Sequence, residues 1–442
     1  MWTGLLTAPL LFASCGERAW PSWDMARHPI RVDTLQLPRF PRRPHVNGVS
    51  AASRVYGPLC AQDHFVLNAP LVEARRNHDC TIESDRYLIN ILGRNGRHVE
   101  RRDLQTGATE LFAVPGHDPA AHPLNDLNHI YGVRVQPLGD VASNSSFDAK
   151  SELWMVCGFH GDRINGEISS SYARVLDLRT MRVRLGPKLL RAGGACSALA
   201  LEIDGPGTPE HICAFGGTDG AHNTGTFLKS VACYDRRRQV WHEPLGELPV
   251  ACDHSNAILL PPSLCHPADP ARVLLMNFRI RHYADERPEI WAIDLPVSAT
   301  PRWYLFANET GTAEYLQPRD AAGVFTTASG RYVFNVGGVS YVMRDMPNGK
   351  RRRLSMKHST VRVFDACARR WAPAGGDVGY GYFALQSCAS SKLGLAFTCG
   401  GQPPDGSVSD KISDNSHNCI VHNLLGPSFG AMYGEVIDRR RQ

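Results

Sequence analysis

Several features that would assign this chain to a common functional class are missing from its sequence. Beyond residue 20, no apolar stretch approaches the length that a helix needs to cross a bilayer. The sequence has no Cys-x-x-Cys spacing of the kind that holds structural zinc, and no Gly-x-Ser-x-Gly elbow typical of serine hydrolases. It therefore predicts no membrane-spanning segment, no zinc-ribbon site and no hydrolase of that type.

A strong charge of one sign is missing as well. The formal net charge is +5, and the basic runs at residues 236–238, 351–353 and 439–441 lie far apart in the chain. Basic residues that are dispersed in this way are typical of solvated turns, whereas a nucleic-acid track needs them clustered on one face. We expect no nucleic-acid partner.

A short phrase that ends in a glycine pair, or in the remnant of one, recurs about every sixty residues. Its markers are separated by 65, 58, 61, 60 and 63 residues, and they are Gly93, Gly158, Gly216, Asn277, Gly337 and Gly400. Such regularity indicates repeated copies of one structural unit.

Each copy contains a fixed order of short apolar runs that predicts four β-strands. In the third copy the runs are residues 195–201, 211–217 and 230–235, followed by Trp241. We expect the second strand to be buried on both faces, the third to alternate, and the glycines to need positive φ. The prediction is an all-β propeller of six four-stranded blades, with a seventh blade in residues 28–70 as the alternative.

This pattern resembles the kelch repeat, in which a strand ending in Gly-Gly precedes a Tyr-Asp pair and a Trp. The matching residues are Gly216, Gly217, Tyr234, Asp235 and Trp241 in the third copy and Gly337, Gly338, Phe364, Asp365 and Trp371 in the fifth. The resemblance covers roughly residues 71 to 425. It implies a kelch-type propeller of the superfamily that includes the central domain of galactose oxidase.

The predicted domain organisation is simple. Residues 1–27 read as a possible signal peptide and leader, residues 28–436 as one kelch propeller, and residues 437–442 as a basic tail. We expect an N-terminal strand at residues 30–38 to complete the last blade, because an open sheet edge invites aggregation.

The first residues bear on the compartment. Residues 3–13 form an apolar run of about the length of a secretory h-region, and Asn144 and Asn308 begin glycan acceptor tripeptides. These features favour a secreted protein. A cytoplasmic location is the alternative, since residues 352–355 resemble the target of a basophilic kinase.

Thirteen cysteines leave at least one thiol unpaired. Cys157 and Cys399 precede glycines on buried strands, where cysteine acts as a small apolar residue. Cys213 and Cys233 lie on strands that should be neighbours, and the sequence favours two buried thiols over a disulfide there.

Candidate binding residues lie near the starts of the first strands, which a propeller brings to its axis. Together they predict a central funnel that binds a protein or a glycan: Arg76, His78, Asp79, His129, Tyr131, Asp253, His254, Arg319, Asp320 and Tyr382. Taken singly, each of them also fits a structural role at a blade junction. The polar cluster at residues 116–129 matches no defined metal site, so we expect a hydrated loop and no metal or cofactor.

The resemblance to galactose oxidase raises the question of catalysis. The copper site of that enzyme uses an adjacent Tyr-His pair, which this sequence lacks, and a histidine from a further C-terminal domain, for which few residues remain after Cys419. We therefore expect a non-catalytic kelch scaffold that binds its partner through one face of the ring. A secreted carbohydrate-active enzyme is the alternative.

Overall fold

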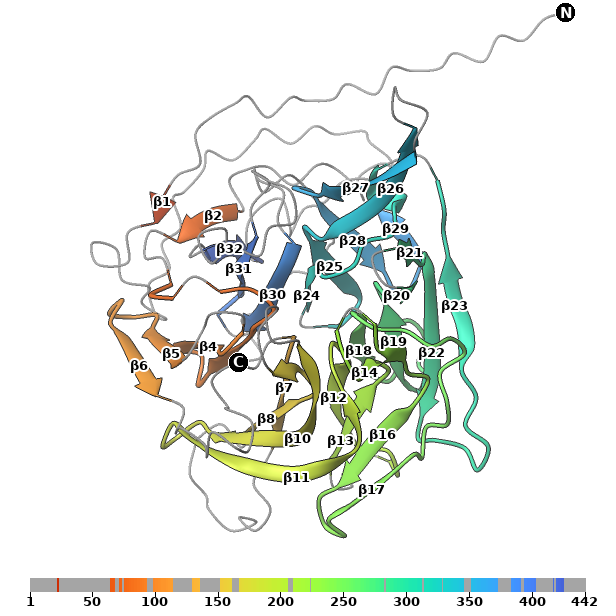
Figure 1. The fold of residues 1–442 in the computed structure, drawn as a ribbon, viewed down its shortest axis with the longest axis horizontal. Helices are drawn as coiled ribbons and strands as arrows, with labels where there is room; N and C mark the ends of the chain where they lie inside the picture. Colours follow the sequence, from red (N-terminus) through yellow and green to blue (C-terminus); the bar gives the residue numbers. More distant parts are fainter. Residues whose placement is uncertain are drawn as a thin grey trace, which may run out of the picture.

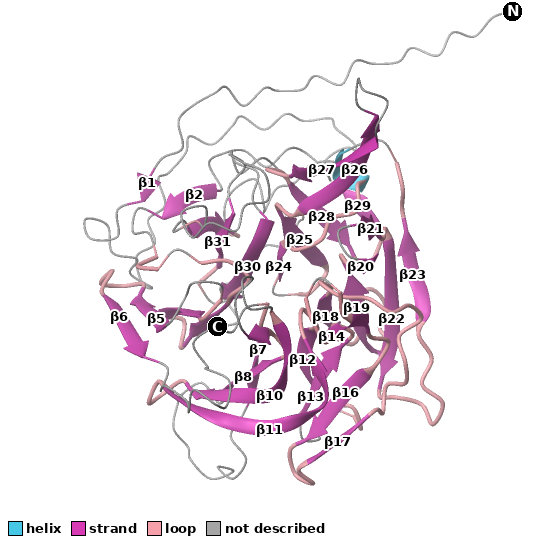
Figure 2. Ribbon diagram, viewed as in Figure 1, coloured by secondary structure: helices cyan, strands magenta, loops and turns pink. Residues whose placement is uncertain are grey.

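The computed structural model of the protein shows six antiparallel sheets arranged around a common axis (Figure 1). Apart from short internal gaps, it describes residues 71–93, 98–113, 129–135, 152–160, 167–345, 351–372, 383–402 and 416–424, together with strand segments at 22–23 and 64–67. Strands dominate these residues, as Figure 2 shows. The predicted all-β propeller of six four-stranded blades is confirmed.

The blades follow one another along the chain, each from its inner to its outer strand. Blade 1 consists of β3 (Asp79–Glu83), β4 (Tyr87–Ile91), β5 (His98–Asp103) and β6 (Thr109–Ala113). Blade 2 consists of β7 (Tyr131–Val135), β8 (Glu152–Val156), β10 (Ile168–Asp177) and β11 (Arg182–Gly193). Blade 3 consists of β12 (Ser197–Leu201), β13 (His211–Phe215), β16 (Val231–Asp235) and β17 (Val240–His242).

Blades 4 and 5 repeat this order. Blade 4 consists of β18 (Asn256–Leu260), β19 (Ala271–Met276), β22 (Glu289–Leu295) and β23 (Tyr304–Asn308). Blade 5 consists of β24 (Gly323–Thr326), β25 (Tyr332–Val336), β28 (Val361–Asp365) and β29 (Arg370–Ala372). Short extra strands occur between second and third strands: β9 (Phe159–His160), β14 (Thr218–Asp219), β15 (Thr226–Phe227), β20 (Arg279–Arg281), β21 (Ala284–Glu286), β26 (Val339–Asp345) and β27 (Arg351–Lys357). A 3-10 turn, η4 (Glu314–Leu316), precedes blade 5.

Blade 6 is completed by a strand from the other end of the chain. Its own strands are β30 (Phe383–Ser390), β31 (Leu395–Gln402) and β32 (Cys419–Asn423). The fourth strand, β2 (His64–Leu67), pairs antiparallel with β32, and β1 (Ser22–Trp23) pairs parallel with β2. An N-terminal strand thus closes the ring, but it lies later than the predicted residues 30–38, which are outside the described residues.

The hydrophobic core lies between the blades. Each buried cluster joins two consecutive blades, from 1 and 2 round to 6 and 1. For example, Phe334 and Val363 of blade 5 pack with Leu385 and Ile420 of blade 6. Because apolar area removed from water stabilises the fold, every blade is held mainly by its two neighbours.

The second strands are buried as predicted, but the third strands do not alternate uniformly. Every residue of β28 is buried, including Arg362, whose guanidinium carbon lies 3.9 Å from the ring centroid of Trp371. Both faces of a middle strand are covered by other blades, so even a charged residue there is enclosed. The expectation of regular alternation in the third strand is wrong for this blade.

The paired glycines adopt the backbone that the sequence predicted. Gly216 and Gly217 have φ of 62° and 103°. A Cβ atom on Gly216 would lie 2.6 Å from the carbonyl oxygen of Cys252. Cys252 lies in the segment that leads into the first strand of blade 4. The doublet therefore serves both a left-handed turn and a close contact between blades.

The cysteine prediction needs correction. The described residues contain four disulfides, Cys157–Cys196, Cys213–Cys233, Cys265–Cys367 and Cys399–Cys419. Cys213 and Cys233 are direct partners in the β13–β16 register, and their Cα atoms lie 4.0 Å apart. Directly opposed side chains on neighbouring strands bring two sulfur atoms within bonding range, so these are not two free thiols.

Candidate metal centre at the propeller axis

The six inner strands begin at the same end of the axis, which we call the hub face. In each blade the start of the inner strand pairs with the end of the second strand, as Ser197 does with Phe215. The loop between second and third strands therefore also lies at the hub face. Side chains from these two kinds of segment can meet there.

A ring of left-handed residues surrounds the axis at the hub face. Each blade contributes one residue with φ between 49° and 59°: Asn77, His129, Ala195, His254, Ala321 and Ala384. Backbone hydrogen bonds link them between blades, since His129 N–H donates to Asn77 O at 2.8 Å and His254 N–H donates to Ala195 O at 2.8 Å. This hub ring fixes where its side chains point.

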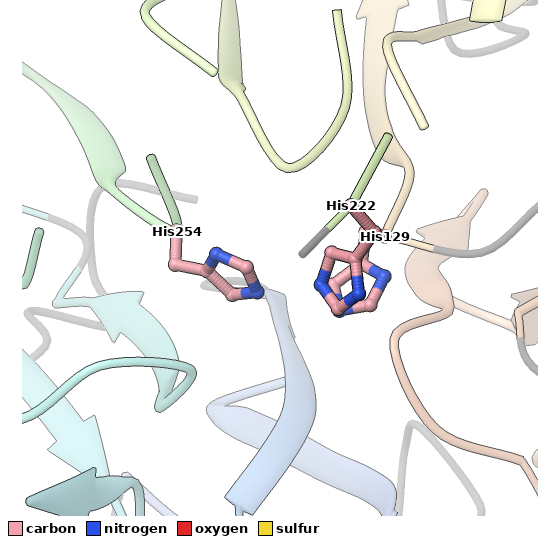
Figure 3. Close-up of side chains that lie close together, drawn as sticks. All are labelled: His129, His222 and His254. Carbon is pink, nitrogen blue, oxygen red and sulfur yellow. The ribbon is translucent and has the colours of Figure 1, made fainter. Parts of the chain in front are cut away.

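Three imidazoles converge at the hub ring from three consecutive blades (Figure 3). His129 precedes β7 of blade 2, and His254 precedes β18 of blade 4. Blade 3 has only Ala195 in the ring, and its imidazole comes from His222, in the turn after β14. One nitrogen of each ring lies within 4.8 Å of one nitrogen of both others.

The rings are packed closely and are nearly enclosed. The ring centroid of His129 lies 4.7 Å from that of His222 and 4.9 Å from that of His254. Phe159 closes one side, with its centroid 4.7 Å from that of His222. The side chain of His222 is 7% exposed and that of His254 is 10% exposed.

Each imidazole has a polar partner beside its Nδ1 atom. Glu167 Oε2 lies 2.9 Å from His222 Nδ1, and Asp253 Oδ2 lies 3.1 Å from His254 Nδ1. The amide nitrogen of Asn77 lies 3.4 Å from His129 Nδ1. Carboxylates beside Nδ1 orient His222 and His254 and leave Nε2 for another contact.

Asp253 is held in its charged form by Arg279. The guanidinium donates from Nε to Oδ1 at 2.7 Å and from Nη2 to Oδ2 at 3.1 Å, and Thr218 Oγ1 donates to Oδ2 at 2.8 Å. Burial alone would raise the pKa of Asp253, but the charge and the hydrogen bonds of Arg279 hold it well below its usual range.

The imidazoles themselves are kept neutral. Burial and the nearby Arg279 charge lower the pKa of His254 to about 4, although Asp253 opposes this shift. Burial also lowers the pKa of His222, against the effect of Glu167. Neutral imidazole is the form that binds metal ions, and three such groups are a donor set suited to zinc, copper or nickel.

Comparisons with known proteins place the chain by its fold alone. Its sequence matches no family model and no curated protein. The solved structure of YjhT is similar, with a TM-score of 0.56 and 11% sequence identity over 79% of this chain and 95% of that one. The likeness shows the propeller fold, and membership of the kelch family stays a prediction.

Four of the predicted binding residues lie at or beside the imidazole cluster. His129 and His254 belong to it, and Asp253 lies beside His254. Tyr131 joins blades 2 and 4, because its hydroxyl donates to Ser255 O at 2.9 Å and accepts from Asn256 Nδ2 at 3.2 Å. The sequence therefore placed these residues at the end of the ring where the imidazoles converge.

The other predicted residues have contacts within the protein. Arg319 is fully buried and donates to the carbonyl oxygens of Gly337 and Thr360 at 3.1 and 2.9 Å. Asp320 lies 3.6 Å from the Arg279 guanidinium. Arg319 therefore bonds within blade 5, whereas Asp320 joins blade 5 to blade 4, which is the structural role that the sequence left open.

Blade 1 holds three more of the predicted residues. Arg76 donates to Gln402 Oε1 at 2.9 Å, which joins blade 1 to blade 6. His78 is fully buried, and Asp79 Oδ1 accepts from the backbone of Cys80 at 2.8 Å. Tyr382 and residues 116–128 lie outside the described residues.

Sequence reasoning missed His222, Glu167 and Arg279, and it predicted no metal site. These residues follow second strands, in loops that the blade pattern places at the hub face. The signal was therefore available in the order of the strands. The strand order could not predict the path of a loop of about a dozen residues, and that path decides which side chains reach the cluster.

Proposed function

We propose that this chain is a secreted, non-catalytic propeller of the kelch type that binds a protein or glycan ligand at its hub face. The observation that carries this proposal is the convergence of His129, His222 and His254 from three blades, with 10% of the His254 side chain exposed. An imidazole nitrogen can donate or accept a hydrogen bond, so the exposed part of the cluster can bind a polar ligand group.

Two features of the repeat support the kelch assignment. Asp235 and Asp365 are the last residues of the third strands of blades 3 and 5, and each carboxylate accepts hydrogen bonds from two backbone N–H groups of the next turn. Trp241 and Trp371 pack on the residues before these aspartates. The motif residues thus have the same role in both copies.

The alternative is a carbohydrate-active enzyme. It is favoured by the donor set at the hub ring, which could hold a metal ion. The absence of a Tyr-His dipeptide from the sequence disfavours a copper site like that of galactose oxidase.

A binding array tests the ligand site. Full-length protein is applied to glycan and peptide arrays, and we expect His254→Ala to lower the signal of bound features at least tenfold. Arg238→Ala is the matched control, because this side chain is 79% exposed in the turn at the opposite end of blade 3. Equal binding by His254→Ala and the unmodified chain would contradict the proposal.

Secretion is supported by the disulfides, which form and persist in oxidising compartments. Asn308 is exposed at the end of β23 and begins an Asn-Glu-Thr acceptor tripeptide. We expect protein made in a eukaryotic secretory host to carry a glycan at Asn308. Intact-mass measurement of the chain and of Asn308→Gln checks this, and equal masses, apart from the substitution, would count against glycosylation there.

A further inference from the structure

We propose that His129, His222 and His254 together bind one divalent transition-metal ion, with zinc the best fit to their chemistry. This proposal adds a metal ion to the proposed binding site. It rests on the proposed function in one respect, because it expects a ligand at the hub face to contact the ion. The ligand group suited to such an ion is an oxygen donor, such as a carboxylate or a sugar hydroxyl.

The position of the donors favours one shared ion. Nitrogen atoms of the three rings lie within 4.8 Å of one another, and the rings come from blades 2, 3 and 4. Nitrogens that bind one zinc ion at about 2.0–2.1 Å must lie within about 4.2 Å of one another, so small rotations of the side chains would bring all three into range. The hub ring already fixes the backbone of two of them.

The surrounding groups are those of a metal-binding histidine set. Metal-binding histidines commonly donate their second ring N–H to a carboxylate or a carbonyl group. Here Glu167 and Asp253 lie beside Nδ1 of His222 and His254. Arg279 in turn fixes Asp253 through two hydrogen bonds. This arrangement orients both rings so that Nε2 is free to coordinate.

His222 provides an independent observation. Its Nε2 atom is buried and has no hydrogen-bond partner, although nine-tenths of the side chain is removed from water. Buried polar atoms without a partner are rare in native proteins and disfavour the folded state. A metal bond at Nε2 would supply the missing contact.

The donor type selects the class of ion. Imidazole nitrogens suit zinc, copper and nickel, whereas magnesium and calcium prefer oxygen ligands. Three protein ligands leave a position open on a tetrahedral ion, as in catalytic rather than structural zinc sites. The ion could therefore bind a ligand directly.

The test uses the full-length chain, freed of metal with a chelator and then titrated with zinc sulfate. We expect one zinc ion per chain by calorimetry and by elemental analysis after dialysis. His222→Ala should weaken zinc binding at least a hundredfold. Glu167→Gln, which keeps all three imidazoles, should weaken it at least tenfold.

His211→Ala is the matched control, because it removes a buried imidazole from the same blade but leaves the cluster intact. It should bind zinc as the unmodified chain does. Circular dichroism measures whether each variant is folded. If His222→Ala does not fold, the zinc affinity of Glu167→Gln tests the proposal instead. Absence of zinc from the unmodified chain, or a zinc affinity of folded His222→Ala equal to that of the unmodified chain, would overturn the proposal.

The zinc titration and the array measurement separate the two proposals. Zinc binding that depends on His222, together with unchanged array binding by His254→Ala, would support the metal site and contradict the ligand site. Array binding that depends on His254, without zinc uptake, would contradict the metal site alone.

Discussion

At the scale of single residues, burial rather than sequence position sets the charge of the groups near the axis. In blade 1, burial lowers the pKa of His78 to about 3 and raises the pKa of Asp79 to about 8. Both side chains are therefore neutral in the fold at mildly acidic pH, where an exposed aspartate would be ionised. Neither is placed to act as a charged binding group.

The raised pKa of Asp79 predicts a pH-dependent stability. The folded chain holds this proton more tightly than the unfolded chain, whose ordinary pKa is 3.8, so the contribution is full below about pH 4 and is lost as the pH rises through 8. Asp79→Asn should therefore gain stability relative to the unmodified chain between pH 5 and pH 8, by on the order of 1.4 kcal/mol for each pKa unit crossed.

Urea denaturation at several pH values measures this difference. Glu110→Gln is the control, since that carboxylate is in the same blade but its side chain is 57% exposed. A difference between Asp79→Asn and the unmodified chain that stays constant from pH 5 to pH 8 would contradict the assigned pKa.

The site residues that could be predicted are those whose position follows from the blade pattern alone. His129 and His254 occupy the same place before an inner strand, so a propeller must bring them to one end of the axis. His222 could not be predicted in the same way, because it lies in a loop. Arg319 shares the expected place, but it is buried and donates hydrogen bonds to Gly337 and Thr360 of its own blade.

At the scale of the strands, the glycine doublets decide how closely neighbouring blades approach. The first glycine of blade 6, Gly400, resembles Gly216, because a Cβ atom there would lie 2.4 Å from the carbonyl oxygen of Arg75 in blade 1. Where a blade lacks the first glycine, Leu92, Cys157 or Asn277 adopts the left-handed backbone instead. The left-handed position that recurs at the end of the second strand therefore serves a contact between blades as well as a turn.

Gly216→Ala should destabilise the fold by about 2 kcal/mol or more, through left-handed strain and the collision with Cys252 O. Gly193→Ala is the control, because its nearest atom, Cys157 Sγ, would be 3.7 Å from the new Cβ atom, an ordinary contact. Denaturation midpoints measure both. A loss of stability that is the same in the two variants would show that the doublet has no special role.

The sequence predicted the strands better than their surroundings. Their order follows from short apolar runs, but the burial of β28 depends on the blades at either side, which no local pattern reports. The disulfides between blades were missed for a similar reason: Cys157 and Cys196, for example, belong to different blades, and only the packed ring brings them together.

At the scale of the whole molecule, the regular spacing of the repeats predicted six blades with a seventh as the alternative, and closure by an N-terminal strand followed from the need to cover a sheet edge. The strand that does this, β2, could not be chosen from the sequence, because it lies outside the repeats. No helix in the described residues is long and apolar enough to cross a membrane.

The ring as a whole is what brings three histidines, distant in sequence, to one point on the axis. A crystal structure of the full chain grown with zinc sulfate, with diffraction data recorded on both sides of the zinc absorption edge, tests this most directly. We predict one strong anomalous peak bonded to His129, His222 and His254. Imidazoles that point away from one another, or a zinc peak only elsewhere on the surface, would contradict it.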